Sequence, residues 1–169
     1  GEVSYVWVGA KFIQPDGDAG RLRWISDNNT VPQVLLLNGY LGVSGHCMMM
    51  RLDNHGLLNN LFYSPYQASN CPNQYQVLCQ TQEATTAASV AVSNVQNTTA
   101  AIQPSTTIGC PDGVTYPEQT GSCYKLFLAK FPWSSAESVC LEGGFALARP
   151  GDNLNIINEL RQKLIDKYG

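Results

Sequence analysis

The chain of 169 residues lacks the features that mark several common classes of function. Its net charge is −3 at pH 7, so it has no excess of basic side chains for binding nucleic acid or an anionic membrane surface. No apolar run approaches the ~20 residues that span a bilayer. We therefore expect neither a nucleic-acid partner nor a membrane partner. The hydrophobic fraction of 44% suits a globular protein with one good core.

Signals for metal binding and catalysis are also missing. The sequence has only two histidines, and its two nearest cysteines, Cys71 and Cys79, are eight positions apart. Zinc sites usually need close pairs of Cys or His. We find no Ser-His-Asp order and no pattern of paired carboxylates. The sequence therefore predicts a protein that is not an enzyme and that has no cofactor and no metal site.

Residues 81–107 contain no aromatic side chain and no glycine, and consist mainly of Thr, Ala, Ser, Val, Asn and Gln. Such a segment cannot bury enough apolar surface to fold alone. We interpret residues 81–108 as a linker, and its hydroxyl groups resemble those of an O-glycosylated stalk. Two N-x-[ST] sequons, at Asn28 and Asn97, add sites for N-glycosylation. The residues predicted to carry covalent glycans are Asn28, Asn97, Thr85, Thr86, Thr98, Thr99, Ser105, Thr106 and Thr107.

The chain does contain six cysteines, and their uneven spacing favours disulfides over metal binding. Disulfides persist in oxidising compartments, so we expect an extracellular, secreted protein. The chain begins at Gly1 rather than Met. We take this to indicate a processed chain or one repeat of a longer one.

The residues before the linker predict mainly strands. An Asn38-Gly39 pair between apolar residues 34–37 and 40–41 predicts a hairpin, because Asn-Gly suits a type I′ turn. Three consecutive Met, at 48–50, should alternate between the two faces of a buried strand. Residues 53–74 are polar and predict a long loop. The expected strands are 3–13, 21–26, 47–52 and 76–80.

The residues after the linker predict a strand at 124–128 and two helices. Ser134 is expected to cap the first helix, with Glu137 completing a capping box, and Gly143-Gly144 to end it. Asn153 should begin the second helix. Its apolar stripe is Leu154, Ile157, Leu160, Leu164 and Ile165, with Glu159, Arg161 and Lys163 outward.

The two ends of the chain each resemble half of a C-type-lectin-like domain, in inverted order. Residues 110–125, with Cys110-Pro111-Asp112-Gly113 and Gly121-Ser122-Cys123-Tyr124, resemble its opening hairpin. Val6-Trp7-Val8-Gly9 stands where the family has its Trp-Ile-Gly signature. The resemblance covers about residues 3–80 and 110–169, and reading residue 169 into residue 1 continues the pattern.

This resemblance implies an α+β fold with two helices, antiparallel sheets and a long loop region. Residues 1–80 would be the C-terminal half of the domain and residues 109–169 the N-terminal half. The family pattern also implies three disulfides that use all six cysteines. The implied pairs are Cys110 with Cys123, Cys79 with Cys140, and Cys47 with Cys71.

Family members that bind sugars through calcium place acidic ligands in the long loop. Here Gln14-Pro15-Asp16 precedes that loop and is interpreted as a turn. Leu58-Asn59-Asn60 stands where the family has Trp-Asn-Asp, and neutral amides bind calcium less well than carboxylates. We therefore predict no family-type calcium site. Asp53, Asn59 and Asn60 could form a degenerate calcium site that binds a ligand, with a carbohydrate as the possible ligand. The alternative, which we favour, is that these three residues only form hydrogen bonds within the loop.

Two arrangements explain the inverted halves. The domain is either circularly permuted within one chain or completed by a neighbouring subunit. In the second case the Cys79–Cys140 bond joins two chains, and a head-to-tail interface that does not close gives a filament. A tandem array cut within a domain fits equally well. From this we expect a structural or adhesive fibre subunit, with a monomeric permuted lectin-like module as the rival.

Overall fold

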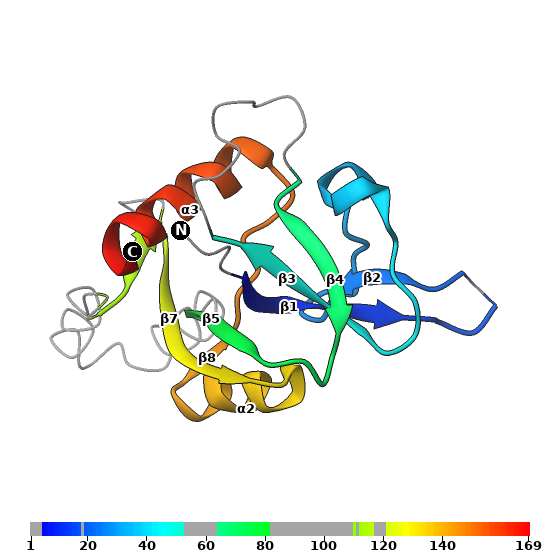
Figure 1. Cartoon of the computed structure of the whole chain (residues 1–169), viewed down its shortest axis with the longest axis horizontal. Helices are drawn as coiled ribbons and strands as arrows, with labels where there is room; N and C mark the ends of the chain where they lie inside the picture. Colours follow the sequence, from blue (N-terminus) through cyan, green and yellow to red (C-terminus); the bar gives the residue numbers. More distant parts are fainter. Residues whose placement is uncertain (1–4, 18, 53–63, 82–109, 111, 117–120) are drawn as a thin grey trace, which may run out of the picture.

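A computed structural model describes residues 5–17, 19–52, 64–81, 110, 112–116 and 121–169. These residues form an α+β domain in which one mixed sheet lies between two helices (Figure 1). The strands are β1 (Tyr5–Ile13), β2 (Arg21–Trp24), β3 (His46–Arg51), β4 (Tyr66–Asn70), β5 (Tyr75–Thr81), β6 (Val114–Tyr116), β7 (Ser122–Phe131) and β8 (Phe145–Leu147). The helices are α2 (Trp133–Glu142) and α3 (Leu154–Tyr168), and two 3-10 turns are η1 (Gln33–Leu35) and η2 (Leu37–Gly39).

The strand order is β4-β3-β1-β5-β7-β6, with β2 attached to β1 and β8 attached to β5. The central strand β5 lies parallel to β1 and antiparallel to β7 and β8. Strands from both ends of the chain therefore share one sheet. The parallel pair makes the sheet mixed, whereas the resemblance implied antiparallel pairing.

Alternating side chains of the strands fill a separate core on each face of the sheet. On β1, Val6 and Val8 enter the core beneath α3, while Trp7 enters the core beneath α2. The methionines of β3 alternate in the same way: Met48 and Met50 lie on the α3 side and Met49 on the α2 side. The predicted alternation of these methionines is confirmed.

Helix α2 begins differently from the prediction. Its N-cap residue is Pro132, and no side chain caps it. Ser134 lies within the first turn, and its carbonyl oxygen accepts from the hydroxyl of Ser138 at 3.4 Å. The predicted capping role of Ser134 is therefore wrong, because the helix starts two residues earlier than a capping box requires. Its end at Gly143 and Gly144 is as predicted, with Gly144 in the left-handed region at φ +80°.

Helix α3 begins as predicted. The side-chain oxygen of Asn153 accepts from the backbone N–H groups of Asn155 and Ile156. Ile157, Leu160 and Leu164 are buried. Arg161 was expected to face outward, but only 1% of it is exposed. It lies four residues after Ile157, and residues four apart share a helix face. Its position therefore belongs to the buried stripe.

The turn of the predicted hairpin at 34–41 is present, but the two paired strands are not. Asn38 and Gly39 have φ values of 55° and 64°, which suit a type I′ turn. The flanking residues nevertheless form η1 and η2 rather than paired strands. Leu36 instead bridges to Tyr66, and Gln33 donates its side-chain amide to the Gly39 carbonyl at 3.0 Å. The Leu36–Tyr66 bridge joins the segment to β4, and the Gln33–Gly39 bond closes the segment on itself.

The predicted loop at 53–74 contains a strand. Residues 66–70 form β4, which pairs antiparallel with β3 from His46 to Met50. The sequence did not predict β4 because most of its side chains are polar. Tyr66 is its one buried residue, and an edge strand needs no more than that. Residues 53–63, the greater part of the linker and residues 117–120 lie outside the described residues.

Candidate functional site

The turn after β2 is held by its own polar groups. The Trp24 carbonyl accepts from the N–H of Asn28, and the N–H of Trp24 donates to the Asn29 carbonyl, at 2.8 and 2.9 Å. The Asp27 carboxylate accepts from the backbone and side-chain N–H groups of Asn29 at 2.9 and 3.0 Å. Asn28 takes a left-handed φ of 64°, which asparagine tolerates. This geometry fixes the direction of the Asp27 carboxylate.

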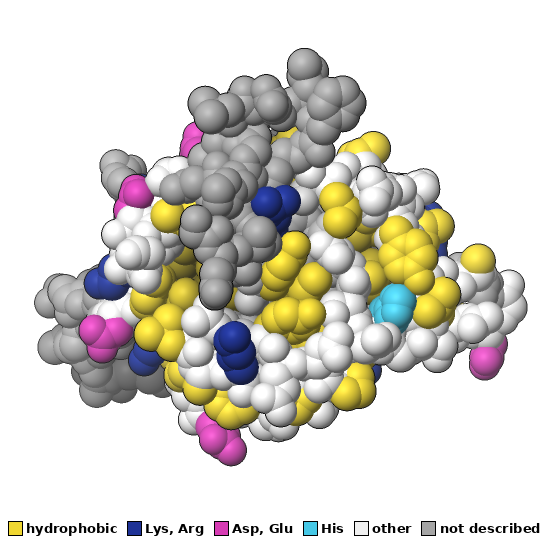
Figure 2. All heavy atoms as spheres, viewed as in Figure 1, with side chains coloured by type: hydrophobic (Ala, Val, Ile, Leu, Met, Phe, Trp, Pro, Cys, Tyr) yellow, Lys and Arg dark blue, Asp and Glu magenta, His cyan; other side chains and the backbone are white. Residues whose placement is uncertain are grey.

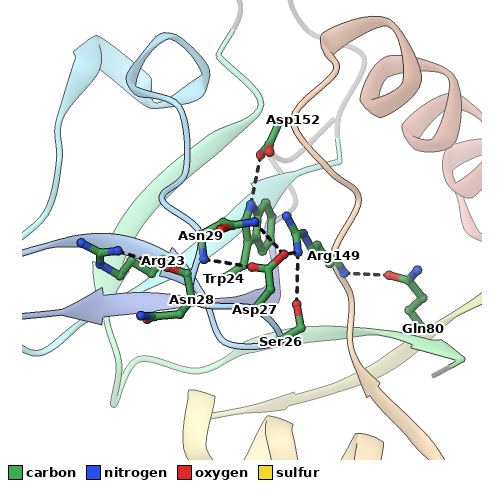
Figure 3. Close-up of polar contacts among 9 residues, drawn as sticks. All are labelled: Arg23, Trp24, Ser26, Asp27, Asn28, Asn29, Gln80, Arg149 and Asp152. Carbon is green, nitrogen blue, oxygen red and sulfur yellow. Dashed lines mark hydrogen bonds and ion pairs between the residues drawn. The ribbon is translucent and has the colours of Figure 1, made fainter. Parts of the chain in front are cut away.

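Arg149, which follows β8, reaches this turn from the other end of the chain (Figure 3). Its guanidinium forms an ion pair with Asp27 and donates to the Ser26 hydroxyl at 3.4 Å. The guanidinium also lies 5.5 Å from the centroid of the Trp24 ring. The side chains of Arg149 and Asp27 are 28% and 35% exposed, so the pair stays at the protein surface.

Two further hydrogen bonds join the same elements. The Gln80 side-chain oxygen accepts from the backbone N–H of Arg149 at 2.8 Å, and its amide donates to the Ser122 hydroxyl at 2.9 Å. The indole N–H of Trp24 donates to the Asp152 carboxylate at 3.0 Å. The cluster thus joins β2, β5, β7 and the segment after β8.

These residues border a groove of about 700 Å³. Gly9 of β1 lines the groove, and its N–H donates to the carbonyl of Ala148, the residue after β8, at 2.8 Å. A Cβ on Gly9 would lie 3.0 Å from the Leu147 carbonyl oxygen, so a larger residue would push β8 away. The lining residues are Gly9, Ile25, Ser26, Asp27, Gln80, Thr81, Ala146, Leu147 and Arg149. The volume is within the ~300–1,000 Å³ typical of ligand sites.

The buried Tyr66 contacts two parts of this polar cluster, the Trp24 ring and the segment after β8. Tyr66 packs edge-on against Trp24 with ring centroids 5.5 Å apart and donates its hydroxyl to the Gly151 carbonyl at 2.8 Å. Burial raises the pKa of Tyr66 well above its ordinary value, and the nearby Asp152 carboxylate raises it further. Tyr66 therefore stays neutral and acts as a structural support.

A second surface lies on the face of η1, η2 and β4. Four large hydrophobic residues are exposed between β2 and β3, and Figure 2 shows yellow side chains around the single cyan histidine there. They are Val34, Leu37, Tyr40 and Val43. The Tyr40 ring lies 5.8 Å from that of His46, and the His46 Nδ1 accepts from the N–H of Val43 at 3.3 Å. Residues 28–45 contain no Asp, Glu, Lys or Arg.

The structure joins the six cysteines in the pairs that the resemblance implied. Cys47 bonds Cys71, Cys79 bonds Cys140, and Cys110 bonds Cys123. The Cys79–Cys140 bond is fully buried and ties β5 to α2. Within this single chain it links the segment before the linker to the segment after it.

Few of the other predicted site residues lie within the described residues. Asn28 does, and its exposed side chain points away from Arg149 (Figure 3). The possible ligand residues Asp53, Asn59 and Asn60 lie outside, as do the predicted glycan carriers at 85–107. Gln14-Pro15-Asp16 lies at the turn between β1 and β2, as expected.

The sequence interpretation did not single out Asp27, Gln80 or Arg149. These residues come from distant parts of the chain, so no local pattern links them. Within the described ranges, no group of three or more His, Cys, Asp or Glu side chains is placed to hold a metal ion. No helix in the described part of the chain is long and apolar enough to cross a membrane.

Comparisons with known proteins find no matching family model, no matching curated protein and no matching solved structure. The described residues form a small α+β domain with two helices, a mixed sheet and three disulfides. This architecture is compatible with a C-type-lectin-like domain.

Proposed function

We propose that this chain is a non-enzymatic, extracellular C-type-lectin-like glycoprotein that serves as a structural or adhesive fibre subunit. In this proposal the segment before the linker completes its domain with the segment after the linker of a neighbouring copy. The same contacts would form within one repeat of a tandem array. The observation that carries the proposal is the position of β5, which is flanked by β7 and β8 from the far end of the chain.

The contacts between the two segments are those of a domain core. Trp7 donates its indole N–H to the Phe131 carbonyl at 2.7 Å, and Trp133 donates to the Val8 carbonyl at 2.9 Å. The buried Cys79–Cys140 bond lies between the same segments. If these contacts formed between two copies, each junction would be as stable as a folded domain, and a head-to-tail series would not close.

The length of the linker supports an exchange between copies. Residues 82–109 separate the two segments, and about thirty extended residues reach on the order of 100 Å. A short connection would suffice to join the segments within one domain. Three disulfides favour an oxidising, extracellular setting. Asn28 is exposed in a turn, which suits an N-glycosylation acceptor.

Mass measured under denaturing, non-reducing conditions tests the proposal, with the disulfides mapped by proteolytic digestion. The fibre hypothesis expects a ladder of species that falls to one chain mass on reduction, with Cys79–Cys140 peptides joining two chains. Mixed isotopically light and heavy chains would then yield hybrid peptides. A single chain mass with three internal disulfides would overturn the covalent fibre.

The second candidate is a monomeric, circularly permuted module that binds a glycan or another ligand through loop residues 28–70. The exposed, uncharged surface of Val34, Leu37, Tyr40 and Val43 favours it, because exposed apolar patches commonly mark binding sites. Calcium titration followed by thermal melting checks for a family-type site. A rise in Tm that chelator reverses would establish such a site, since a ligand that binds only the folded state stabilises it.

A further inference from the structure

The segment between β2 and β3 carries an apolar surface on the outside of the domain (Figure 2). The apolar surface consists of Val34, Leu37, Tyr40 and Val43, which are 84%, 37%, 47% and 50% exposed. Leu35 and Leu36, which lie between the first two, are buried in the core beneath α3. The core therefore takes the inner side chains of this segment and leaves the four outer ones in solvent.

Hydrogen bonds fix the shape of the apolar surface. The N–H of Gly39 donates to the Leu36 carbonyl at 2.8 Å, and the Gln33 amide donates to the Gly39 carbonyl at 3.0 Å. Val43 and His46 form two bonds: the N–H of His46 donates to the Val43 carbonyl at 3.0 Å, and the N–H of Val43 donates to the His46 Nδ1 at 3.3 Å. Because the segment is already ordered, binding of a partner costs little conformational entropy.

Elsewhere in the described part of the chain, large hydrophobic residues are exposed only one to an element. They are Leu128 on β7, Leu141 on α2 and Ile156 on α3. Each of these three lies within three positions of a Lys or Glu in the sequence. Single exposed hydrophobic residues are normal on a protein surface, whereas a group of them marks an interaction site. The apolar surface is such a group.

The charge pattern of the chain indicates which partner fits. Residues 28–50 and 64–81 contain no Asp, Glu, Lys or Arg, so neither the apolar surface nor β4, to which its segment bridges, has an ionised carboxylate or basic side chain. A two-fold contact between identical copies brings a surface against itself, and charges of one sign would then repel each other. An apolar surface with a tyrosine and no charge is typical of the centre of an interface. This surface therefore suits a second copy of the chain.

The small size of the apolar surface predicts a weak contact. A stable interface buries about 800 Å² and about 20–30 residues on each side. Four residues form this surface, so isolated copies should associate weakly. Copies linked in series hold many such surfaces at high local concentration, which strengthens a weak contact. This last step rests on the proposed fibre, whereas the contact itself does not.

We propose that the apolar surface is a two-fold contact between copies of this chain, in which each copy packs these four residues against the same four residues of the other. The contact is separate from the head-to-tail completion of the domain, because the apolar surface comes entirely from the segment before the linker. In a fibre, it would join neighbouring chains side by side.

Site-specific photo-cross-linking tests the contact directly in the full chain. p-Benzoylphenylalanine in place of Tyr40 keeps an aromatic ring and bonds to neighbouring C–H groups on irradiation. After reduction and digestion, mixed isotopically light and heavy chains should yield a hybrid that joins one light and one heavy copy of the tryptic peptide 24–51. The same group in place of Leu141, exposed on α2, is the matched control and should give no light–heavy hybrid. Equal hybrid yields at the two positions, or cross-links at position 40 to other peptides only, would overturn the proposal.

Charge substitutions at Val34 show whether the surface meets its own copy. In the photo-cross-linkable chain, Val34→Glu and Val34→Lys each place like charges in the contact and should each lower the hybrid yield about tenfold. Mixing the Val34→Glu and Val34→Lys chains should restore the yield, because opposite charges then face one another. Leu128→Lys, at an exposed position of β7, is the matched control and should leave the yield unchanged. Thermal melting verifies that each variant is folded. No recovery in the mixture, or an equal loss in Leu128→Lys, would refute the two-fold contact.

The same assay decides between a second copy and a carbohydrate. Maltohexaose, a neutral oligosaccharide, should leave the hybrid yield unchanged. If no hybrid forms and maltohexaose is itself cross-linked at position 40, the surface binds sugar and the proposal is wrong. Failure of this proposal leaves the fibre hypothesis intact, because mass under denaturing conditions does not depend on a non-covalent contact.

Discussion

Trp133 at the start of α2 donates its indole N–H to the carbonyl of Val8 at 2.9 Å, although 125 positions separate the two residues. The bond is buried, and it joins the first strand of the chain to a helix near the far end. The strand β1 and the helix α2 therefore depend on one another. This dependence holds whether the two segments belong to one chain or to two.

Trp133→Phe removes the donor of this bond and keeps a ring in the core. We expect the free energy of unfolding to fall by about 2 kcal/mol, because the Val8 carbonyl loses a buried partner. Urea unfolding measures the change. Leu141→Ala on the exposed face of α2 should alter stability by no more than about 0.5 kcal/mol. Equal losses in the two variants would refute the role of the indole bond.

Strands β1, β2, β3, β5 and β7 were predictable from sequence, because local periodicity sets which face of a strand is buried, whereas the short strands β4, β6 and β8 were not predicted. The alternation of Met48, Met49 and Met50 is an example. Tertiary contacts decided the conformation of the segments whose prediction failed, such as residues 34–41. Leu36 bridges to Tyr66 of β4, and this contact replaced the hairpin that Asn38-Gly39 favoured.

The candidate groove was not predictable in the same way. Asp27 is one residue before a sequon and Arg149 follows an apolar strand, and neither position has a local signature. They meet only because β8 attaches to β5 beside the diverging β1. The cysteine pairs, by contrast, followed from the family resemblance, since a pairing pattern belongs to a fold rather than to local sequence.

The two disulfides that involve the C-terminal segment should differ in their effect on stability. The Cys79–Cys140 bond spans 61 positions and the Cys110–Cys123 bond spans 13. Within one chain, a longer loop loses more entropy when it closes. Replacing Cys79 and Cys140 by Ala should therefore lower the free energy of unfolding by about 4 kcal/mol. Replacing Cys110 and Cys123 by Ala should lower it by about 3 kcal/mol.

Urea unfolding at several protein concentrations measures both costs. If the Cys79–Cys140 bond is within one chain, the difference in free energy of unfolding between the two variants should not depend on protein concentration. If loss of the Cys79–Cys140 bond makes the midpoint depend on concentration, the two segments are exchanged between copies. A larger loss for the Cys110–Cys123 variant would contradict the loop-length argument.

The caps of the two helices allow a matched pair of substitutions. Asn153→Ala removes the acceptor for two N–H groups at the start of α3 and should cost about 1 kcal/mol. Ser134→Ala should change stability by less than about 0.5 kcal/mol, because Ser134 lies inside α2 and caps nothing. Chemical denaturation compares the two. A loss in Ser134→Ala as large as that in Asn153→Ala would restore the capping role that the sequence suggested.

Stability should fall in alkaline solution because of Tyr124. Burial raises the pKa of Tyr124 from 10.0 to about 12, with a smaller effect from Tyr116. Below pH 10 the hydroxyl keeps its proton in both the folded and the unfolded state. Between pH 10 and 12 the unfolded chain loses this proton first, so stability falls as pH rises, by about 2–3 kcal/mol in total.

Tyr124→Phe isolates this contribution, because it removes the ionisable group and keeps the ring. The free energy of unfolding of the native chain should drop more steeply from pH 9.5 to 11.5 than that of the variant. Tyr66, whose pKa is also raised by burial, should contribute to the slope that remains in Tyr124→Phe. Urea unfolding at closely spaced pH values measures both slopes. Parallel slopes in the native chain and the variant would show that Tyr124 ionises equally well in the folded state, and that its burial does not govern alkaline stability.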